Sequence, residues 1–266
     1  MDILKIKRIR DMSNKHESSV ITYSSNEAVE ARKELFNLLK NYPGTEEETE
    51  RSLGLFIRGS LLARIFAIRE LYEQVVDLPG IIIDLGTWRG QTAVICENLR
   101  AIFEPLHFNR RIICFDTFEG YVGFSEEDKA TNLHKDGTYS TGGDYTEVLE
   151  KLLLLHETSN AMGHINNKHK VIKGDCMITL PTFFKENPNE FVSLAFFDVN
   201  AFNPTLKSFE AIYERLVPNG IVAFWQLTRN VVPAEGKVYT TNILDKYNHQ
   251  IHRSKFYPGL CYIIKK

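Results

Sequence analysis

The chain has 266 residues, of which 43% are hydrophobic and 25% are charged, and its formal net charge at pH 7 is -2. These values are ordinary for a globular protein, and the small net charge gives no global field that would attract nucleic acid or an anionic membrane. We expect a reduced, cytoplasmic protein without a membrane span, because the apolar runs are short, residues 1–25 show no signal-peptide pattern and no C-x-x-C spacing occurs.

Two helices are predicted before the first strand. Apolar residues recur at helical spacing over residues 26–39 and, more strongly, over residues 60–76. Pro and Gly end the first helix at residues 41–44 and the second at residues 79–80. We therefore expect residues 1–55 to form a partly helical N-terminal extension, which could also pair subunits in a homo-oligomer.

From residue 80 onward, predicted strands alternate with predicted helices. The strands cover residues 81–83, 111–115, 170–172, 191–197 and 221–225, followed by a hairpin-like pair near 248–253 and 259–265. The helices cover residues 92–103, 145–156, 177–185, 205–216 and 235–246. This alternation predicts an α/β fold with a doubly wound, mostly parallel seven-stranded sheet in residues 56–266. Ligands of such sheets bind beyond the carboxyl ends of the strands.

The first strand leads into the motif D-x-G-x-W-x-G over residues 84–90. Gly86 can form a tight turn, Gly90 allows close helix packing, and the helix N-terminus offers free backbone N–H groups. A dinucleotide site normally has a further glycine where this chain has Trp88, which disfavours a nicotinamide-dependent oxidoreductase. The turn therefore favours an adenosine cofactor without a pyrophosphate, with a purely structural turn as the alternative.

Acidic residues follow the next three strands. Asp116 could accept hydrogen bonds from ribose hydroxyls, or it could cap a helix. Asp175 could bind an adenine amino group beside Cys176, or it could cap the following helix. Asp198 emerges from an apolar strand, where an unpaired carboxylate is costly. It is therefore expected to bind the cofactor's positive charge, a metal or the acceptor.

Several short motifs occur in a characteristic order. They are Asp116-Thr117-Phe118-Glu119-Gly120, Lys173-Gly174-Asp175 and Phe197-Asp198-x-Asn200-x-Phe202-x-Pro204-Thr205. Over roughly residues 55–227 the chain resembles the class I S-adenosylmethionine-dependent methyltransferases, and more narrowly the macrocin O-methyltransferase (TylF/MycF-like) family. The resemblance implies a Rossmann-like domain, S-adenosyl-L-methionine as cofactor and O-methylation of a small sugar-containing or secondary-metabolite acceptor.

The same resemblance implies cofactor contacts position by position. It assigns the methionine part to the first turn, the ribose to the second strand end, the adenine to the third, a covering segment to the residues before the first strand, and an acceptor-side lid to residues 121–144. The residues concerned are Asp84, Gly86, Thr87, Trp88 and Gly90 in the first turn; Asp116, Thr117 and Phe118 at the second strand end; Gly174, Asp175 and Cys176 at the third; Arg58 and Ser60 in the covering segment; and Asp198 after the fourth strand.

One departure from the family concerns a metal. Similar family members bind Mg²⁺ through the Asp that matches Asp198 and further acids, which fall here on Asn200, Asn203 and the pair Trp225-Gln226. One carboxylate with amides is a poor ligand set for Mg²⁺, so we expect no tightly bound metal. This loss also motivates an alternative function, a cofactor-binding scaffold subunit without catalysis.

Two residues are expected to carry the chemistry. His134, in the polar lid, is the candidate base that removes the hydroxyl proton. The alternative interpretation is that His134 is an exposed histidine of the loop. Asp198 is expected to act at the acceptor. Trp225 could form the floor of an acceptor pocket or pack in the core. The small net charge predicts neither a nucleic-acid nor a membrane partner.

Overall fold

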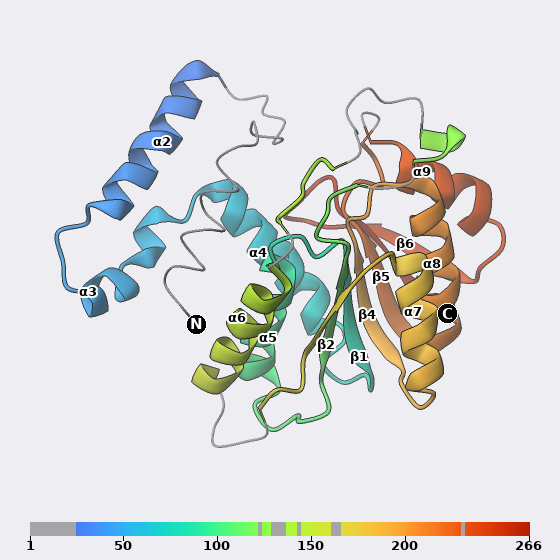
Figure 1. Ribbon diagram of the computed structural model, residues 1–266. Helices are drawn as coiled ribbons and strands as arrows, with labels where there is room; N and C mark the ends of the chain where they lie inside the picture. The colour runs from blue at the N-terminus through green and yellow to red at the C-terminus, as the bar shows by residue number, and fades with distance from the viewer. Residues whose placement is uncertain (1–24, 122–123, 129–136, 143–144, 161–165, 230–231) are drawn as a thin grey trace.

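One seven-stranded sheet runs through the computed structural model, which describes residues 25–121, 124–128, 137–142, 145–160, 166–229 and 232–266 (Figure 1). The strands are β1 (Ile81–Leu85), β2 (Ile112–Asp116), β3 (Lys170–Lys173), β4 (Val192–Phe197), β5 (Leu216–Phe224), β6 (His249–Arg253) and β7 (Cys261–Lys265). Their order is β3-β2-β1-β4-β5-β7-β6. β7 is antiparallel to both neighbours and all other pairs are parallel, which confirms the predicted fold class.

Helices cover both faces of this sheet (Figure 1). One face packs against α4 (Gly59–Glu73), α5 (Gln91–Phe103) and α6 (Tyr145–Asn160). The other packs against α7 (Cys176–Glu186), α8 (Phe202–Arg215), α9 (Ala234–Val238) and the π-helix η3 (Tyr239–Ile243). Ile81 and Ile83 point to the second face and Ile82 to the first. A strand covered on both sides must be apolar throughout, which explains the run of isoleucines.

The N-terminal helices stand away from the sheet (Figure 1). They are α2 (Asn26–Lys40), α3 (Glu46–Arg51) and the short 3-10 helix η1 (Leu53–Phe56), and neither α2 nor α3 buries a residue. A second 3-10 helix, η2 (Glu126–Asp128), lies in the segment before α6. No helix in the described parts of the chain is long and apolar enough to cross a membrane.

Two elements differ from their predicted bounds. Residues 218–220 were expected to separate a helix from a strand, but β5 already begins at Leu216 and passes through them with a register irregularity against β4. Asn219 adopts φ 64°, a left-handed conformation that asparagine tolerates, so the turn residues bulge the strand without ending it. The predicted helix over residues 235–246 is instead α9 followed by η3.

Candidate active site

A cleft of about 570 Å³ opens at the carboxyl ends of β1, β2, β3, β4 and β5. Its wall is formed mainly by the residues that directly follow these strands, with contributions from α4 and from the lid segment. This is the place that a doubly wound sheet predicts for a ligand, because the loops diverge there.

The turn after β1 depends on two glycines. Gly86 has φ 75°, and a Cβ at this position would lie 2.5 Å from the Asp198 carbonyl oxygen. Gly90 has φ 81°, and a Cβ there would lie 2.1 Å from Leu149 of α6. Gly86 therefore lets the chain pass close to β4 and lines the cleft, whereas Gly90 packs α5 against α6 and does not line it. Thr87 lines the cleft, and its hydroxyl donates to the Asp84 carbonyl oxygen at 2.7 Å.

Asp116 is held rigidly at the cleft wall. Its Oδ2 accepts the Trp88 N–H and its Oδ1 accepts the Phe118 N–H, both at 2.7 Å. Burial raises the pKa of Asp116, and the two backbone donors act against this rise. Phe118 is fully buried, so only its N–H reaches this site, while Thr117 lines the cleft. Further lone pairs of the carboxylate remain available to a ligand with neighbouring hydroxyls.

Asp175 serves as the N-cap of α7. Its Oδ1 accepts the Met177 N–H at 2.8 Å. The same residue lines the cleft together with Gly174 and Cys176. The capping role and the predicted ligand role are therefore compatible. A carboxylate that accepts one hydrogen bond from the helix N-terminus still has lone pairs that can accept others.

Asp84 lies buried behind the turn and does not line the cleft. Its Oδ2 has no hydrogen-bond partner among the described residues. Burial raises the pKa of Asp84 to about 7, with the Arg64 guanidinium acting against the rise and the Asp198 and Asp116 carboxylates adding to it. A buried carboxylate with a free oxygen favours a cation in the neighbouring space.

Asp198 lines the cleft next to an arginine from α4. Arg64 Nη2 lies 3.6 Å from Asp198 Oδ2, and the side chains are each 24% exposed. The amide nitrogen of Asn200 donates to the Tyr121 hydroxyl at 2.7 Å and lies 3.3 Å from Asp198 Oδ1. Arg64 was not predicted, because it lies far from every strand end in the sequence.

Trp225 does not form the floor of the cleft. It is fully buried, stacks on Phe196 with a centroid distance of 6.2 Å, and carries the Arg64 guanidinium carbon 3.7 Å from its ring centroid. The core reading of Trp225 is therefore correct. The alternative prediction, that Trp225 forms the floor of an acceptor pocket, was wrong because the Arg64 guanidinium covers the face of the ring.

Two further predicted site residues lie away from the cleft. Arg58 and Ser60 are exposed at the start of α4 and do not line the cleft, whereas Arg64, about one turn further along, does. His134 lies outside the described residues, as does much of the predicted lid.

Aromatic side chains line one side of the cleft mouth. The Tyr139 ring meets the rings of Trp88 and Tyr121 edge to face, with centroid distances of 6.0 and 5.5 Å. All three residues line the cleft, and Trp88 is 39% exposed. Such a wall can pack against a sugar or another flat ligand. Tyr121 and Tyr139 carried no recognisable motif in the sequence.

The profile of the family described as macrocin-O-methyltransferase (TylF) matches residues 7–235. The chain belongs to this family. It is an S-adenosylmethionine-dependent O-methyltransferase, as the order of its strand-end motifs predicted. No protein among the curated sequences matches the chain.

Solved structures agree with the TylF assignment. The calicheamicin methyltransferase CalS11 is 30% identical over 94% of this chain and 96% of its own, with a TM-score of 0.85. An apo structure of CalS11, described as a TDP-rhamnose 3'-O-methyltransferase, gives 29% identity over 94% and 99% of the two chains and a TM-score of 0.78. The O-methyltransferase NovP, at 16% identity over 77% and 80%, shares the fold with a TM-score of 0.58.

The cleft of this TylF-family enzyme fits S-adenosylmethionine. Gly86 and Asp116 both line it, and the carboxylate oxygens of Asp116 could accept hydrogen bonds from ribose hydroxyls. The free oxygen of Asp84 lies behind the turn that would hold the methionine part, so its charge complements a cationic ligand without touching it. When bound, the cofactor supplies an electrophilic methyl group.

The Asp116→Ala variant is expected to bind S-adenosylhomocysteine about 10- to 100-fold more weakly than the wild type. A hydrogen bond to a charged group contributes about 1.5–3 kcal/mol, and the loss also frees the two backbone donors that shape the turn. Calorimetric titration measures this change. The neighbouring Glu119→Ala variant is the control, because Glu119 is exposed and pairs only with Lys173 in the described structure. Equal affinities in the two variants would exclude Asp116 as a ligand.

Cofactor affinity is expected to rise by up to about tenfold between pH 6 and pH 8. With a pKa of about 7, Asp84 is mostly protonated and neutral at pH 6 and mostly ionised at pH 8. Only the ionised form attracts a cation, so the binding-competent fraction rises with pH. Calorimetry with S-adenosylmethionine at several pH values tests this, with Asp84→Asn as the control that should lose the dependence. The same slope in both proteins would assign the titration to another group.

The part of the cleft around Asp198, Asn200 and Gln226 does not fit a divalent metal. No group of three or more His, Cys, Asp or Glu residues within the described ranges is arranged to hold one. Asp198 is next to the Arg64 guanidinium, and the side-chain oxygen of Gln226 accepts a hydrogen bond from Arg229 at 2.9 Å. Mg²⁺ prefers several hard, charged oxygen ligands, and this donor set offers one carboxylate that already faces a cation.

Proposed function

We propose that this enzyme methylates a hydroxyl group of a nucleotide-linked sugar. The observation that carries the proposal is the acceptor wall of the cleft, where aromatic rings lie next to a carboxylate and arginines. An aromatic wall packs against a sugar ring, and arginine forks match the oxygens of a diphosphate. Arg89 and Arg229 both line the cleft. CalS11, by its description, acts on such an acceptor, TDP-rhamnose.

Asp198 is the residue that we propose to take the proton from the acceptor hydroxyl. It lines the cleft and has one oxygen near Asn200 and the other near Arg64, so a hydroxyl can reach it from the open side. With S-adenosylmethionine bound, the acceptor oxygen bonds to the methyl carbon, the carbon–sulfur bond breaks and the sulfur keeps the electron pair. His134 remains the alternative proton acceptor.

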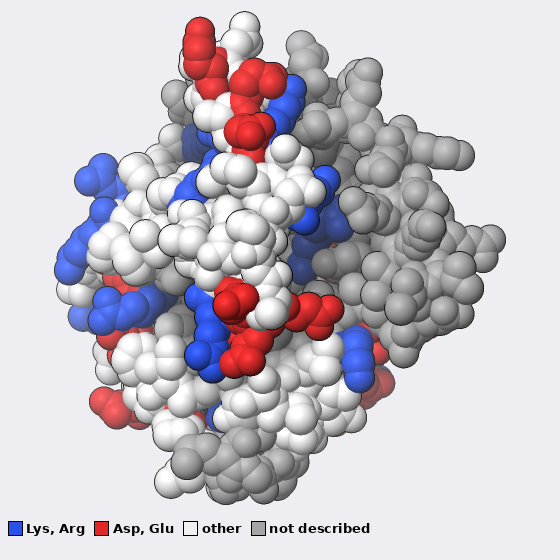
Figure 2. All heavy atoms as spheres, turned by 90° about the vertical axis from the view of Figure 1, so that its left-hand side faces the viewer, with Lys and Arg blue, Asp and Glu red and all other residues white. Residues whose placement is uncertain are grey.

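The mixed charge on one face of the molecule also agrees with a small-molecule acceptor rather than a nucleic acid (Figure 2). Figure 2 shows positive and negative side chains interspersed on the face that carries the N-terminal helices, without a broad basic patch over the described residues. Such a patch is what binding to a nucleic-acid backbone would require. We further propose that the enzyme acts in the cytoplasm, since its four cysteines are all free and buried.

We propose that residues 121–144 act as a lid over the acceptor, and that residues 1–55 form an extension outside the methyltransferase domain of residues 56–266. Two described contacts support the lid: Asp128 accepts the N–H of Phe202, the first residue of α8, and Glu127 pairs with Lys237 of α9. These contacts connect the segment to the start of α8, shortly after Asp198, and to α9.

The acceptor proposal is tested with labelled S-adenosylmethionine and a panel of acceptors. The panel contains thymidine diphosphate sugars, the corresponding free sugars and phenols of similar size. We expect transfer to the nucleotide sugars and little to the other two groups. Transfer to phenols alone would contradict the acceptor class. Tight cofactor binding without transfer to any acceptor would favour the non-catalytic scaffold.

A further inference from the structure

The side chain of Arg64 is fixed on the acceptor side of the cleft by three contacts. Its guanidinium stacks on the buried ring of Trp225, with 3.7 Å between the guanidinium carbon and the ring centroid. Its Nη2 donates to the Thr92 hydroxyl at 3.1 Å and faces Asp198 Oδ2 at 3.6 Å. Trp225 is in turn held by Phe196 and Tyr257. The charge therefore sits on a rigid support, which restricts its movement.

We propose that the Arg64 guanidinium is the acceptor-side cation of this enzyme, taking the place of a divalent metal and binding the acceptor oxygen whose proton Asp198 removes. The proposal rests on the proposed O-methylation of a sugar hydroxyl. It adds a catalytic residue from α4 to a site otherwise built from strand ends.

The distance between the two charged groups supports this role. At 3.6 Å, Arg64 and Asp198 attract each other but are not directly hydrogen-bonded, and both line the cleft. A hydroxyl oxygen beside them can accept from the guanidinium and donate to the carboxylate at the same time. As its proton passes to Asp198, the oxygen gains negative charge, which a fixed cation in a partly desolvated site stabilises. A guanidinium stays charged throughout the pH range of such assays.

The same contact explains why the site does not fit a metal ion. A divalent ion bound to Asp198 would lie within a few ångströms of the guanidinium, and like charges at that distance repel strongly. The remaining nearby amides, Asn200 and Gln226, are neutral. The side-chain oxygen of Gln226 already accepts from Arg229, and the Asn200 nitrogen donates to Tyr121, so the Asn200 oxygen, unpartnered among the described residues, is a single neutral ligand beside Asp198. Trp225 supports the arginine where an acid would otherwise support a metal.

The first test compares Arg64→Met and Arg64→Lys with the wild type at saturating S-adenosylmethionine and a nucleotide sugar that reacts. We expect kcat to fall about 10²- to 10³-fold in Arg64→Met, in the range found when one donor to a developing oxyanion is removed. Arg64→Lys should recover part of this loss. Excess EDTA should leave the wild-type rate unchanged. The control is Arg69→Met, on the same helix, since Arg69 pairs with Glu73 on the surface.

Two further readouts separate a catalytic role from a structural one. The affinity for S-adenosylhomocysteine and the unfolding temperature of Arg64→Met should stay close to the wild-type values while kcat falls. A loss of kcat matched by lost stability and cofactor affinity would overturn the catalytic assignment. So would activity that EDTA abolishes and Mg²⁺ restores, an outcome that would leave the proposed O-methylation intact.

The second test needs no acceptor. Mn²⁺ is titrated into the complex with S-adenosylhomocysteine, and bound Mn²⁺ is measured by electron paramagnetic resonance. We expect no site that depends on Asp198. Mn²⁺ binding by the wild type that disappears in Asp198→Asn would overturn the inference. If no nucleotide sugar reacts, the proposed function fails, and this titration decides on its own whether a metal lies beside Asp198.

Discussion

The Asp198→Asn variant is expected to lose about 10²- to 10⁴-fold in kcat, the usual contribution of a positioned general base. Asparagine keeps the shape of the side chain but cannot accept the hydroxyl proton. The backbone of Asp198 should remain in place, because its N–H donates to Leu85 O and its carbonyl lies against Gly86. The rate of methyl transfer at saturating cofactor and acceptor measures the effect.

His134→Ala is the informative comparison for this variant. If Asp198 takes the proton, His134→Ala should retain most of its kcat and show at most a raised KM for the acceptor. The opposite ranking, with a near-normal rate in Asp198→Asn and a large loss in His134→Ala, would transfer the base role to the histidine. Affinity for S-adenosylhomocysteine should be nearly unchanged in both variants, which excludes a damaged cofactor site as the cause.

The parts of the site that lie along the chain were predictable from the sequence. The glycine turn after β1 and the acids after β2, β3 and β4 each follow an apolar strand directly, and parallel strands bring these ends to one edge of the sheet. Asp116, Asp175 and Asp198 accordingly all line the cleft. The order of their motifs also led to the TylF family, which the match over residues 7–235 shows.

The parts that depend on tertiary packing were not predictable in this way. Arg64 reaches the cleft only because α4 packs beside β5 and presents it to Trp225, a contact across about 160 residues of chain. Tyr139 meets Trp88 through the fold of the lid segment. Helix α3 was also missed, although its capping box, Thr45 with Glu48, is a local signal that the sequence carries.

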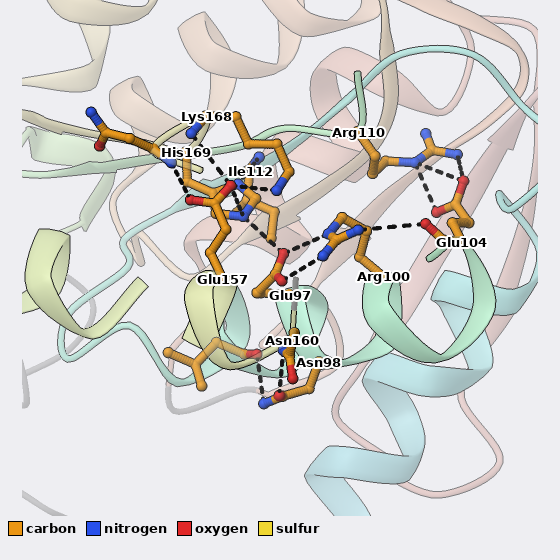
Figure 3. Close-up of polar contacts among 12 residues, drawn as sticks. Glu97, Asn98, Arg100, Glu104, Arg110, Ile112, Glu157, Asn160, Lys168 and His169 are labelled. Atoms are coloured by element: carbon orange, nitrogen blue, oxygen red, sulfur yellow. Dashed lines mark hydrogen bonds and ion pairs between the residues drawn. The ribbon is translucent and has the colours of Figure 1, made fainter. Parts of the chain in front are cut away.

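A buried ionic network at the opposite end of the sheet was not predicted from the sequence. Glu97 accepts hydrogen bonds from Arg100 and contacts His169, which is also buried (Figure 3). Burial raises the pKa of Glu97, but these partners outweigh it and lower the value to about 2. Charged residues in a polar stretch look exposed until the fold pairs them.

Arg110 in this region has a fully buried side chain. Its guanidinium donates to both carboxylate oxygens of Glu104, as Figure 3 shows, and also to the Ser193 hydroxyl. It donates further to the carbonyl oxygens of Gly80, Val75, Val76 and Leu78. A single side chain thus satisfies the backbone between α4 and β1, which would otherwise be buried without partners.

The Arg110→Met variant is expected to lower the free energy of unfolding by about 3–5 kcal/mol, because it leaves the buried Glu104 carboxylate without its counter-ion. For a chain of this length the unfolding temperature should fall by roughly 6–20 °C. Denaturant and thermal unfolding measure both values. The matched control is the neighbouring Arg111→Met. The ion pair of Arg111 with Glu190 is partly exposed, at 23% and 22%, and such pairs contribute at most about 1 kcal/mol.

A double variant separates the two sources of this loss. If the stranded carboxylate dominates, Glu104→Gln combined with Arg110→Met should be more stable than Arg110→Met alone, because a neutral amide costs less to bury than an unpaired charge. If the unsatisfied carbonyl groups dominate, the second change should recover nothing. Equal destabilisation of Arg110→Met and Arg111→Met would contradict the whole account, since burial is what distinguishes the two arginines. Methyl-transfer activity of the folded fraction should persist in all of these variants, because the network lies at the amino end of β1 and the cleft at its carboxyl end.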